Sequence, residues 1–336
     1  MKKLIISITL ILFITSTIFA NTKDNTKDNA FLGMWGIDIE GGGVAWLHVF
    51  NEHGFLDAEL LWIGGSIVPV ASVYLADDNT LVVTRTEEVK KNESRSHTMT
   101  YTMRINKVGE TIEGIMTAPD WMATGERKIP FKGKRMPQMF AKPDLSKLKF
   151  GKAIKLFNGK NLKGWHLMNP EKKKNGFSVV NGQLTNTPIQ PKDGHHISYG
   201  NIRTDQEFSD FNLKLAVNVP KGDNSGVYLK GLYEIQVADT YGKELDSHNM
   251  GALYSRITPT EAAEKPAGEW QNLDITLVDR HVTVVLNGIK IIDNKPVLGP
   301  TGGAISSDVL APGPIYLQGD HGNVSYKNIV LTPIIK

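Results

Sequence analysis

The stretch from Asp223 to Gly242, DNSGVYLKGLYEIQVADTYG, contains two short runs in which apolar and polar residues alternate. Alternation with a period of two places successive side chains on opposite faces of a strand, so each run predicts a half-buried β-strand. The runs join at Lys230 and Gly231, which predicts a tight hairpin. If the apolar residues face a core, the remaining ones share the opposite face. They are Tyr228, Lys230, Glu234 and Gln236.

This polar set combines an acid, a cation, an amide and a phenol. Such a surface suits gripping a polyhydroxylated ligand and moving its protons, although a solvated sheet face has a similar composition. Similar alternating segments recur along a chain that has 32 glycines and almost no helical periodicity. These features predict an all-β protein. A short helical turn is expected only within Thr258 to Ala267, where Thr260 is the candidate cap.

The first twenty residues have the pattern of a secretory signal peptide. Lys2 and Lys3 precede an apolar run that ends at Ala20 and is shorter than the roughly 20 residues of a spanning helix. An uncleaved anchor is the alternative. The chain contains no cysteine, so it has no site for a cysteine-linked lipid, and export without disulfides is typical of a bacterial periplasm. We therefore expect a periplasmic or secreted protein with no stable membrane insertion after cleavage.

The roughly 315 remaining residues are enough for two domains. Residues 21–30 are polar and repeat TKDN, which is typical of a disordered spacer. Short strands at regular intervals in residues 31–136 predict a small β-barrel or meander, and residues 137–150 form a proline-containing linker. Amphipathic strands and Asn-Gly turns in residues 151–336 predict a jelly-roll β-sandwich, with a barrel as the alternative.

The charge of the chain bears on nucleic-acid binding, and its tryptophans bear on ligand binding by the first domain. The net charge is only +3 and no basic block stands out, so nucleic acid is not an expected partner. Trp35, Trp46 and Trp62 in the first domain either line a ligand cavity or fill the core of a small barrel.

The second domain lacks the familiar catalytic signatures. It has no Gly-x-Ser-x-Gly elbow, His-Glu-x-x-His motif, phosphate loop or cysteine nucleophile, so Ser-His-Asp hydrolysis is unsupported. The acids, amides and histidines that remain suit acid–base catalysis or binding of a divalent metal ion. His195 and His196 either lie on the same rim or are simply solvated. Outside the central hairpin the candidates are Asp239, His248, Tyr254, Gln318, Asp320 and His321.

Four blocks between Ala153 and Ile334 resemble, in the same order, the 3-keto-disaccharide hydrolase domain family. The blocks are LFNGKNLKGW, NSGVYLKGLYEIQVADTYG, GEWQNLDITLVDRHVTVVLNG and GPIYLQGDHGNVSYKNIVLTPI. The part before Arg135 has a weaker resemblance to a lipocalin-like β module. The resemblance implies a concanavalin-like jelly roll that acts on an oligosaccharide or glycoside oxidised at C3. Lys230 stands where arginine is common in this family, and lysine lacks the bidentate fork of arginine.

A ketone at C3 acidifies the proton on C2, so a base can remove it and the enolate can expel the substituent at C1, after which water adds back. Such an enzyme needs a base, a group for the enolate oxygen and an acid for the leaving oxygen. We expect Glu234 to be the base or a metal ligand, and His321 to be an acid, base or ligand. An ordinary two-carboxylate glycosidase and a non-catalytic lectin-like module remain alternatives. The expected substrate-binding residues are Tyr228, Lys230, Gln236, Tyr254 and Gln318, with Asp239 and Asp320 in support.

Overall fold

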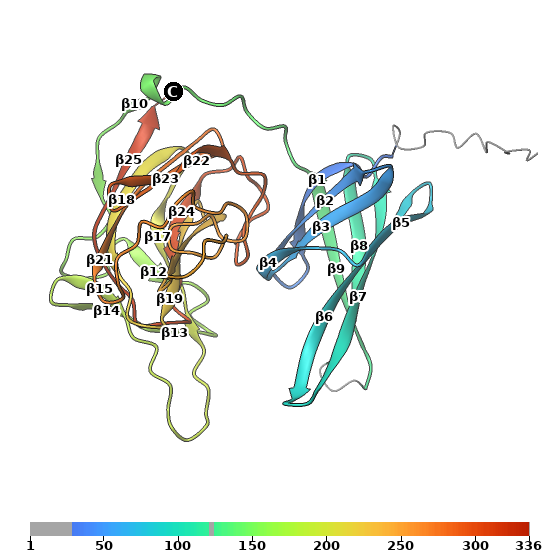
Figure 1. Cartoon of the computed structure of the whole chain (residues 1–336), viewed down its shortest axis with the longest axis horizontal. Coiled ribbons are helices and arrows are strands. Elements are labelled where there is room, and N and C mark those ends of the chain that lie inside the picture. Colours follow the sequence, from blue (N-terminus) through green and yellow to red (C-terminus); the bar gives the residue numbers. More distant parts are fainter. Residues whose placement is uncertain (1–28, 121–123, 336) are drawn as a thin grey trace, which may run out of the picture.

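The computed structural model describes residues 29–120 and 124–335. Within these ranges the regular structure is β-strand, apart from one short 3-10 helix, η1 (Leu145–Lys147). The strands form two units, and the linker passes from one to the other as an extended segment that ends at η1 (Figure 1). The predicted signal peptide and most of the predicted spacer lie outside the described residues. No helix in the described part is long and apolar enough to cross a membrane.

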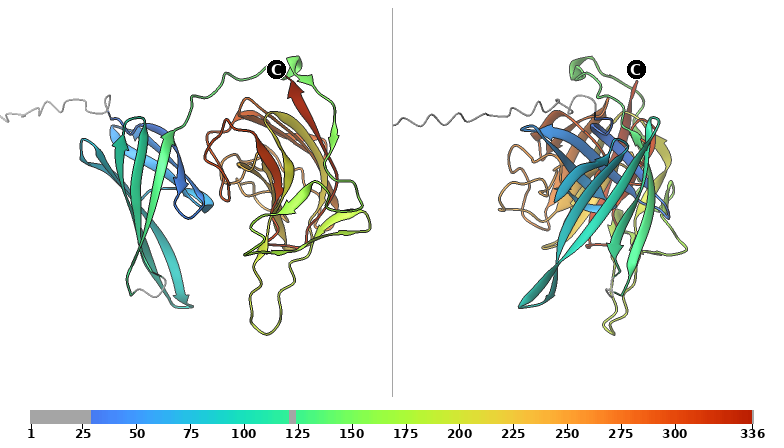
Figure 2. Two further views of the ribbon diagram at one scale, coloured as in Figure 1. Left: turned by 180° about the vertical axis from the view of Figure 1, so that it is seen from behind. Right: turned by 90° about the vertical axis from the view of Figure 1, so that its right-hand side faces the viewer.

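The first unit is one nine-stranded antiparallel sheet in the order β4-β3-β2-β1-β9-β8-β7-β6-β5. It is strongly twisted (Figure 2). Neighbours in the sheet are neighbours in sequence except where β1 pairs with β9. Its strands are β1 (Gly33–Ile39), β2 (Val44–Glu52), β3 (Phe55–Trp62), β4 (Gly64–Pro69), β5 (Ser72–Asp77), β6 (Thr80–Asn92), β7 (Arg95–Val108), β8 (Thr111–Pro119) and β9 (Glu126–Arg135).

The three tryptophans of this unit have different surroundings. Trp35 is fully buried in the core of the sheet, where its Nε1 donates to the carbonyl of Phe31 at 2.8 Å. Trp62 is partly buried and packs against Phe131. Trp46 instead belongs to the hydrophobic core of the second unit. Core packing, rather than a ligand cavity inside the first unit, therefore accounts for Trp35 and Trp46.

The second unit is a β-sandwich of the jelly-roll kind. Its larger sheet runs β14-β15-β25-β18-β21-β22-β23, with β10 and β11 also paired to β25, and its smaller sheet runs β12-β17-β24-β19-β20. The larger sheet contains β10 (Lys149–Phe150), β11 (Ile154–Lys155), β14 (Phe177–Val180), β15 (Gln183–Asn186), β18 (Phe211–Asn218), β21 (Trp270–Val278), β22 (His281–Leu286), β23 (Ile289–Pro296) and β25 (Ser325–Ile335). The smaller sheet contains β12 (Trp165–Leu167), β17 (Ile202–Phe208), β19 (Asn224–Leu229), β20 (Tyr233–Ala238) and β24 (Gly313–Leu317), and β13 (Lys174–Asn175) pairs separately with β16 (Tyr199–Gly200).

Alternation explains how the two sheets enclose one core. In β18, Phe211, Leu213, Leu215 and Val217 are buried, whereas Lys214 between them is exposed. These apolar residues meet those of β19, β20 and β24 from the smaller sheet in one hydrophobic cluster. Each sheet therefore keeps one face for the core, and the opposite face of the smaller sheet is available for a site.

The helical turn expected within Thr258 to Ala267 does not form. The backbone N and Oγ1 of Thr260 both donate to the carbonyl of Ile291, at 2.9 and 3.2 Å, so Thr260 fastens this segment to β23 instead of capping a helix. Pro259 and Pro266 lie near the two ends of this segment, and a proline disfavours helical backbone in the residue before it. The interval between them is too short for a stable helix.

Candidate active site

The hairpin of β19 and β20 presents the central polar residues. Its register places Tyr228 opposite Glu234 and Gly226 opposite Gln236. On the outer side of β20, Gln236 N donates to Ala252 O at 2.9 Å and Tyr254 N donates to Glu234 O at 3.0 Å. The edge strand is thus held by hydrogen bonds on both sides. The side chains of Glu234 and Gln236 share one face, as alternation predicts.

A cleft of about 390 Å³ lies over this face. It brings together most of the residues predicted from the sequence and adds others, including two from the first unit. Its lining is Gly64, Gly65, Asn201, Asn224, Tyr228, Glu234, Gln236, Tyr254, Gly302, Gly303, Tyr316, Gln318, Asp320 and His321.

Glu234 is the most deeply buried acid of the cleft, with 4% of its surface exposed. Burial raises the pKa of its carboxyl to about 7, although a hydrogen bond from Tyr228 and the charge of His321 both favour ionisation. Its backbone N donates to Thr301 Oγ1 at 2.9 Å, which anchors the residue to the adjacent loop. The carboxyl is therefore close to half-ionised at neutral pH, as suits a group that exchanges protons.

Tyr228 has one hydroxyl proton and two acceptors within reach. Its Oη lies 2.8 Å from Glu234 Oε2 and 2.8 Å from the carbonyl of Gly302. A protonated Glu234 can donate to the Tyr228 oxygen while Tyr228 donates to Gly302, whereas an ionised Glu234 competes with that carbonyl for the same proton. Burial, then the charge of Glu234, raises the pKa of Tyr228 well above its ordinary value, so the phenol stays protonated. Its ring stacks on Tyr316 at 3.8 Å.

Asp320 and His321 form the second ionisable pair. His321 Nδ1 lies 2.7 Å from Asp320 Oδ1. This hydrogen bond raises the pKa of His321, although burial opposes the change, and the charge of Glu234 raises it further. Burial favours the neutral form of Asp320, but the hydrogen bond and the charge of His321 outweigh it and lower the pKa of that carboxyl. The cleft thus places the hydrogen-bonded pair of Asp320 and His321 in electrostatic contact with Glu234.

Amide side chains complete the polar lining. Asn201 Oδ1 accepts from Gly319 N at 3.0 Å, and the backbone N of Gln318 donates to Gly226 O at 3.0 Å. Asn224 Oδ1 is buried and has no hydrogen-bond partner among the described residues. An unpaired buried acceptor costs roughly 1–3 kcal/mol, and a hydroxyl of a bound ligand would remove that cost. Asn224 is therefore a candidate contact for a substrate hydroxyl.

Seven lining residues were not predicted from the sequence: the four glycines and the three side chains of Asn201, Asn224 and Tyr316. Tyr316 lies two positions before Gln318 in the same strand pattern, and Asn224 lies two positions before Gly226, so extended alternation could have found both. Asn201 carries no such signal.

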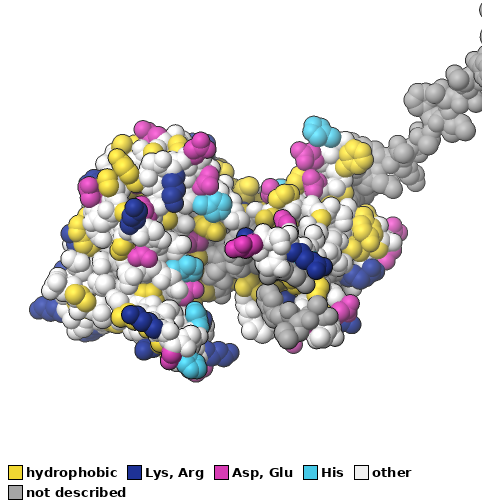
Figure 3. Space-filling view, turned by 60° about the horizontal axis from the view of Figure 1, so that its bottom comes forward, with side chains coloured by type: hydrophobic (Ala, Val, Ile, Leu, Met, Phe, Trp, Pro, Cys, Tyr) yellow, Lys and Arg dark blue, Asp and Glu magenta, His cyan; other side chains and the backbone are white. Residues whose placement is uncertain are grey.

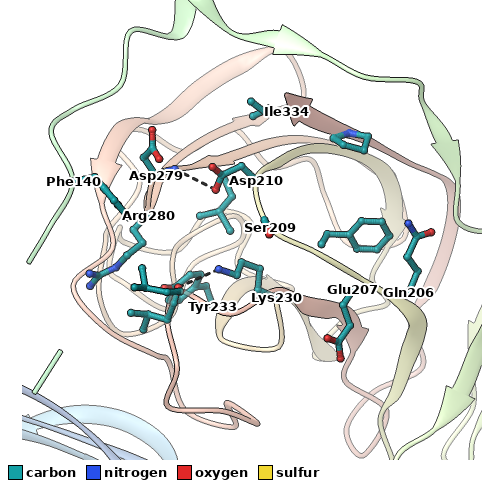
Figure 4. Close-up of a pocket in the computed structure, with 15 residues that line it drawn as sticks. Phe140, Gln206, Glu207, Ser209, Asp210, Lys230, Tyr233, Asp279, Arg280 and Ile334 are labelled. Carbon is teal, nitrogen blue, oxygen red and sulfur yellow. Dashed lines mark hydrogen bonds between the residues drawn. The ribbon is translucent and has the colours of Figure 1, made fainter. Parts of the chain in front are cut away.

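The prediction that Lys230 shares this face is wrong. Lys230 follows the last residue of β19 and adopts a left-handed backbone, with φ of 56°, so the alternation ends before it. Its Nζ donates to the carbonyl of Val309 at 3.1 Å. The side chain points into a separate cavity of about 540 Å³, which it shares with Tyr233 and Arg280 (Figure 4).

Other candidates also lie outside the cleft lining. Asp239 Oδ2 accepts from Gly222 N at 2.9 Å and so holds a loop. His195 and His196 are on an exposed loop and do not line the cleft. His248 contacts the first unit, with Nε2 2.8 Å from Ser66 Oγ. In the described ranges, no three His, Asp or Glu side chains meet in an arrangement that could hold a metal ion.

Comparison with known proteins identifies the second unit. A family model described as the 3-keto-alpha-glucoside-1,2-lyase-like domain matches residues 152–332. No curated protein matches the chain.

Crystal structures of three candidate glycosyl hydrolases from Parabacteroides distasonis are similar to this chain. The first is 28% identical, with a TM-score of 0.43, and the match covers 57% of this chain and 93% of that protein. The second is 22% identical, with a TM-score of 0.44 and coverage of 53% and 92%. The third is 25% identical, with a TM-score of 0.41 and coverage of 55% and 100%. The family match leaves the first unit outside it.

Proposed function

This chain belongs to the 3-keto-alpha-glucoside-1,2-lyase-like domain family, and we propose that it cleaves the glycosidic bond of sugars that carry a ketone at C3. Family membership supports action on carbohydrates. The observation that carries the more specific proposal is the buried Glu234 carboxyl, with a pKa of about 7, in one cleft with the hydrogen-bonded pair of Asp320 and His321. A base and an acid of this kind are what elimination next to a ketone needs.

In the proposed reaction, ionised Glu234 removes the proton from C2. The electron pair of the C–H bond forms a C2–C3 double bond, and the ketone becomes an enolate. When the ketone re-forms, the pair moves to a C1–C2 double bond and the C1–O bond breaks. The leaving oxygen takes a proton from His321. The products are the free aglycone and a 2-hydroxy-3-keto glycal, to which water can add to complete a net hydrolysis.

Neighbouring groups support each step. The phenol of Tyr228 holds the carboxyl of Glu234 in place at 2.8 Å, and Asp320 favours the imidazolium form of His321 that can donate. The amides of Gln236, Gln318 and Asn224 are suited to hold sugar hydroxyls or the enolate oxygen, because an amide offers both donors and an acceptor. Each of these steps is assigned to side chains of this cleft alone.

An ordinary glycoside hydrolase is the second candidate, and one observation favours it. Glu234 with its raised pKa and Asp320 with its lowered pKa occupy the same cleft, which is the pattern of an acid and an ionised partner in two-carboxylate glycosidases. In that mechanism Glu234 begins the reaction protonated. A ketone at C3 would then be unnecessary.

The deciding experiment compares a 3-keto glucoside with its unoxidised parent, each with and without a chelator. We expect the purified protein to convert only the 3-keto compound and the Glu234→Gln variant to convert neither. Equal cleavage of both compounds supports ordinary hydrolysis instead. If the protein binds the sugars and converts neither, it is a lectin-like module. Loss of activity with chelator alone would show that a metal takes part.

We also propose that the protein is exported through residues 1–20, because a basic start, an apolar run and Ala20 have the pattern of a signal peptide. N-terminal sequencing of the protein recovered from its host should then begin after Ala20. A mature chain that still begins at Met1 would contradict export by cleavage.

A further inference from the structure

The turn between β3 and β4 of the first unit reaches the cleft of the second. Gly64 and Gly65, the first two residues of β4 directly after this turn, are among the residues that line it. The two units form separate lobes that meet over part of their facing surfaces, beside a notch (Figure 3). β4 lies at the side of the first unit that faces the sandwich (Figure 1). The cleft is therefore built by both units.

Hydrogen bonds fasten this turn on both sides of the two glycines. The backbone N of Gly303 donates to Ile63 O at 2.9 Å. Beyond the glycines, Ser66 Oγ lies 2.8 Å from Nε2 of His248, and Ile67 N donates to Ser255 Oγ at 2.8 Å. Three separate bonds to the second unit fix the position of a turn this short.

The backbone of Gly65 packs so closely on Gly302 that Gly302 has no room for a side chain. A methyl group on Gly302 would lie 2.3 Å from the carbonyl oxygen of Gly65, so the two backbones are in direct contact. The carbonyl of Gly302 also accepts the hydrogen bond from Tyr228, which in turn contacts Glu234. The dipeptide Gly302-Gly303 thus contacts the first unit and, through Tyr228, also supports the carboxyl of Glu234.

A larger apolar contact supports the turn. Trp46, Leu61 and Met136 of the first unit belong to the hydrophobic cluster of the sandwich. The guanidinium of Arg256 lies over the Trp46 ring at 4.4 Å, and a methyl group on Gly299 would lie 2.4 Å from Trp46 Nε1. Burial of these large side chains favours one fixed arrangement over two loosely tethered units.

The two glycines also determine how much space remains in the cleft. A Cβ on Gly64 or Gly65 would have no atom within 4 Å, so a side chain there would extend into open space beside the cleft. The cavity of about 390 Å³ is already at the low end of the roughly 300–1,000 Å³ usual for small-molecule sites. A cleft of this size suits one or two sugar rings better than a polysaccharide chain.

We propose that the β3–β4 turn and the start of β4 form a fixed wall of the catalytic cleft and that Gly64 and Gly65 set the size of leaving group it accepts. The substrates are then small glycosides, such as 3-keto disaccharides. The chemical identity of the substrate in this inference depends on the proposed function. The position of the wall depends only on the contacts between the two units.

The first test varies the size of the leaving group in the full chain. Gly65 has φ of 72°, a region that asparagine tolerates, so Gly65→Asn should add a side chain to the wall without unfolding the turn. We expect KM for a 3-keto disaccharide to rise about tenfold or more, and KM for a 3-keto methyl glucoside to change less than about threefold. Gly54→Asn is the control, because Gly54 has φ of 85°, has equal space and lies in the β2–β3 turn away from the cleft. Equal KM values for the parent and Gly65→Asn with both substrates would overturn the proposal.

The second test does not depend on turnover. The chain has no cysteine, so Gly64→Cys introduces a single thiol at the wall. In a Glu234→Gln background, which prevents consumption of the ligand, we expect a 3-keto disaccharide or its unoxidised parent to slow alkylation of this thiol. Alkylation of the control Ser94→Cys, in the exposed β6–β7 turn, should stay unchanged. Equal alkylation of Gly64→Cys with and without either sugar contradicts the wall. If the parent protein converts no 3-keto glycoside but the sugars still protect this thiol, the proposed reaction is wrong and the wall is supported.

Discussion

Gly226 faces the carboxyl of Glu234 so closely that a methyl group on Gly226 would lie 2.3 Å from Glu234 Oε1. Gly226 is paired with Gln236, two positions along the hairpin from the pair of Tyr228 and Glu234, so both pairs lie on the same face. The space for the carboxyl therefore exists because this one strand residue lacks a side chain. The backbone at Gly226 is not left-handed, so the requirement is for space and not for backbone freedom.

Gly226→Ala should displace the Glu234 carboxyl from Tyr228. Forcing an extra carbon into a packed site typically costs about 1–3 kcal/mol of stability, and the displaced base should lower kcat/KM for a 3-keto glucoside by at least about tenfold. Steady-state kinetics and thermal unfolding measure the two effects. Gly151→Ala is the matched control, because the added methyl there meets only ordinary contacts at 3.5 Å. Unchanged kinetics in Gly226→Ala would show that the carboxyl position is not critical.

The pH dependence of the rate should identify the working form of Glu234. Burial raises its pKa to about 7, so if the ionised form is the base, kcat/KM must rise with pH through about 7. The raised pKa of His321 predicts a fall at higher pH, as the imidazolium is lost, and hence a bell-shaped profile. A profile that instead falls as pH rises through about 7 means that Glu234 acts as an acid, as in ordinary glycoside hydrolysis.

Stability should depend on pH through the same group. The folded-state pKa of Glu234, about 7, lies above its ordinary value of 4.5. Between these two pH values the folded chain therefore keeps the proton of this carboxyl, whereas the unfolded chain has lost it. Its contribution to stability is complete below about pH 4.5 and is lost as pH rises to about 7. One pKa unit corresponds to about 1.4 kcal/mol, so the loss is about 2–4 kcal/mol.

Glu234→Gln removes that titration and isolates the effect. The free energy of unfolding of the variant, minus that of the parent, should increase between pH 5 and pH 8 by roughly the same few kcal/mol. Denaturant unfolding at both pH values measures it. A constant difference would mean that Glu234 titrates equally in the folded and unfolded chains.

Alternation along the strands was sufficient to predict much of the fold and part of the cleft. It placed Glu234 and Gln236 on one face because side-chain direction in a strand reverses at every residue. It failed at Lys230, because a left-handed turn residue no longer follows the strand.

The part of the cleft from the first unit could not be predicted from local sequence. Gly64 and Gly65 lie about 170 residues before Glu234 in the chain, and their glycines indicate only a turn. Their role comes from the packing of one unit on the other, through contacts such as that of Ser66 with His248. Such tertiary contacts have no period or motif along the chain.

The last prediction compares the effects of removing the hydroxyl of Tyr228 and the hydroxyl of Tyr316, whose rings are stacked. Tyr228→Phe removes the hydrogen bond that favours the ionised form of Glu234, so the pKa of Glu234 should rise further and the rising limb of kcat/KM should move to higher pH. Tyr316→Phe is the matched control, because the Tyr316 hydroxyl donates to the carbonyl of Gly303 at 2.6 Å and not to Glu234. Each variant leaves one carbonyl without its donor, which costs roughly 1–3 kcal/mol, so both should be destabilised to a similar extent. Only Tyr228→Phe should move the limb. An equal shift in both variants would show that the pH profile responds to loss of packing around the cleft and not to the bond between Tyr228 and Glu234.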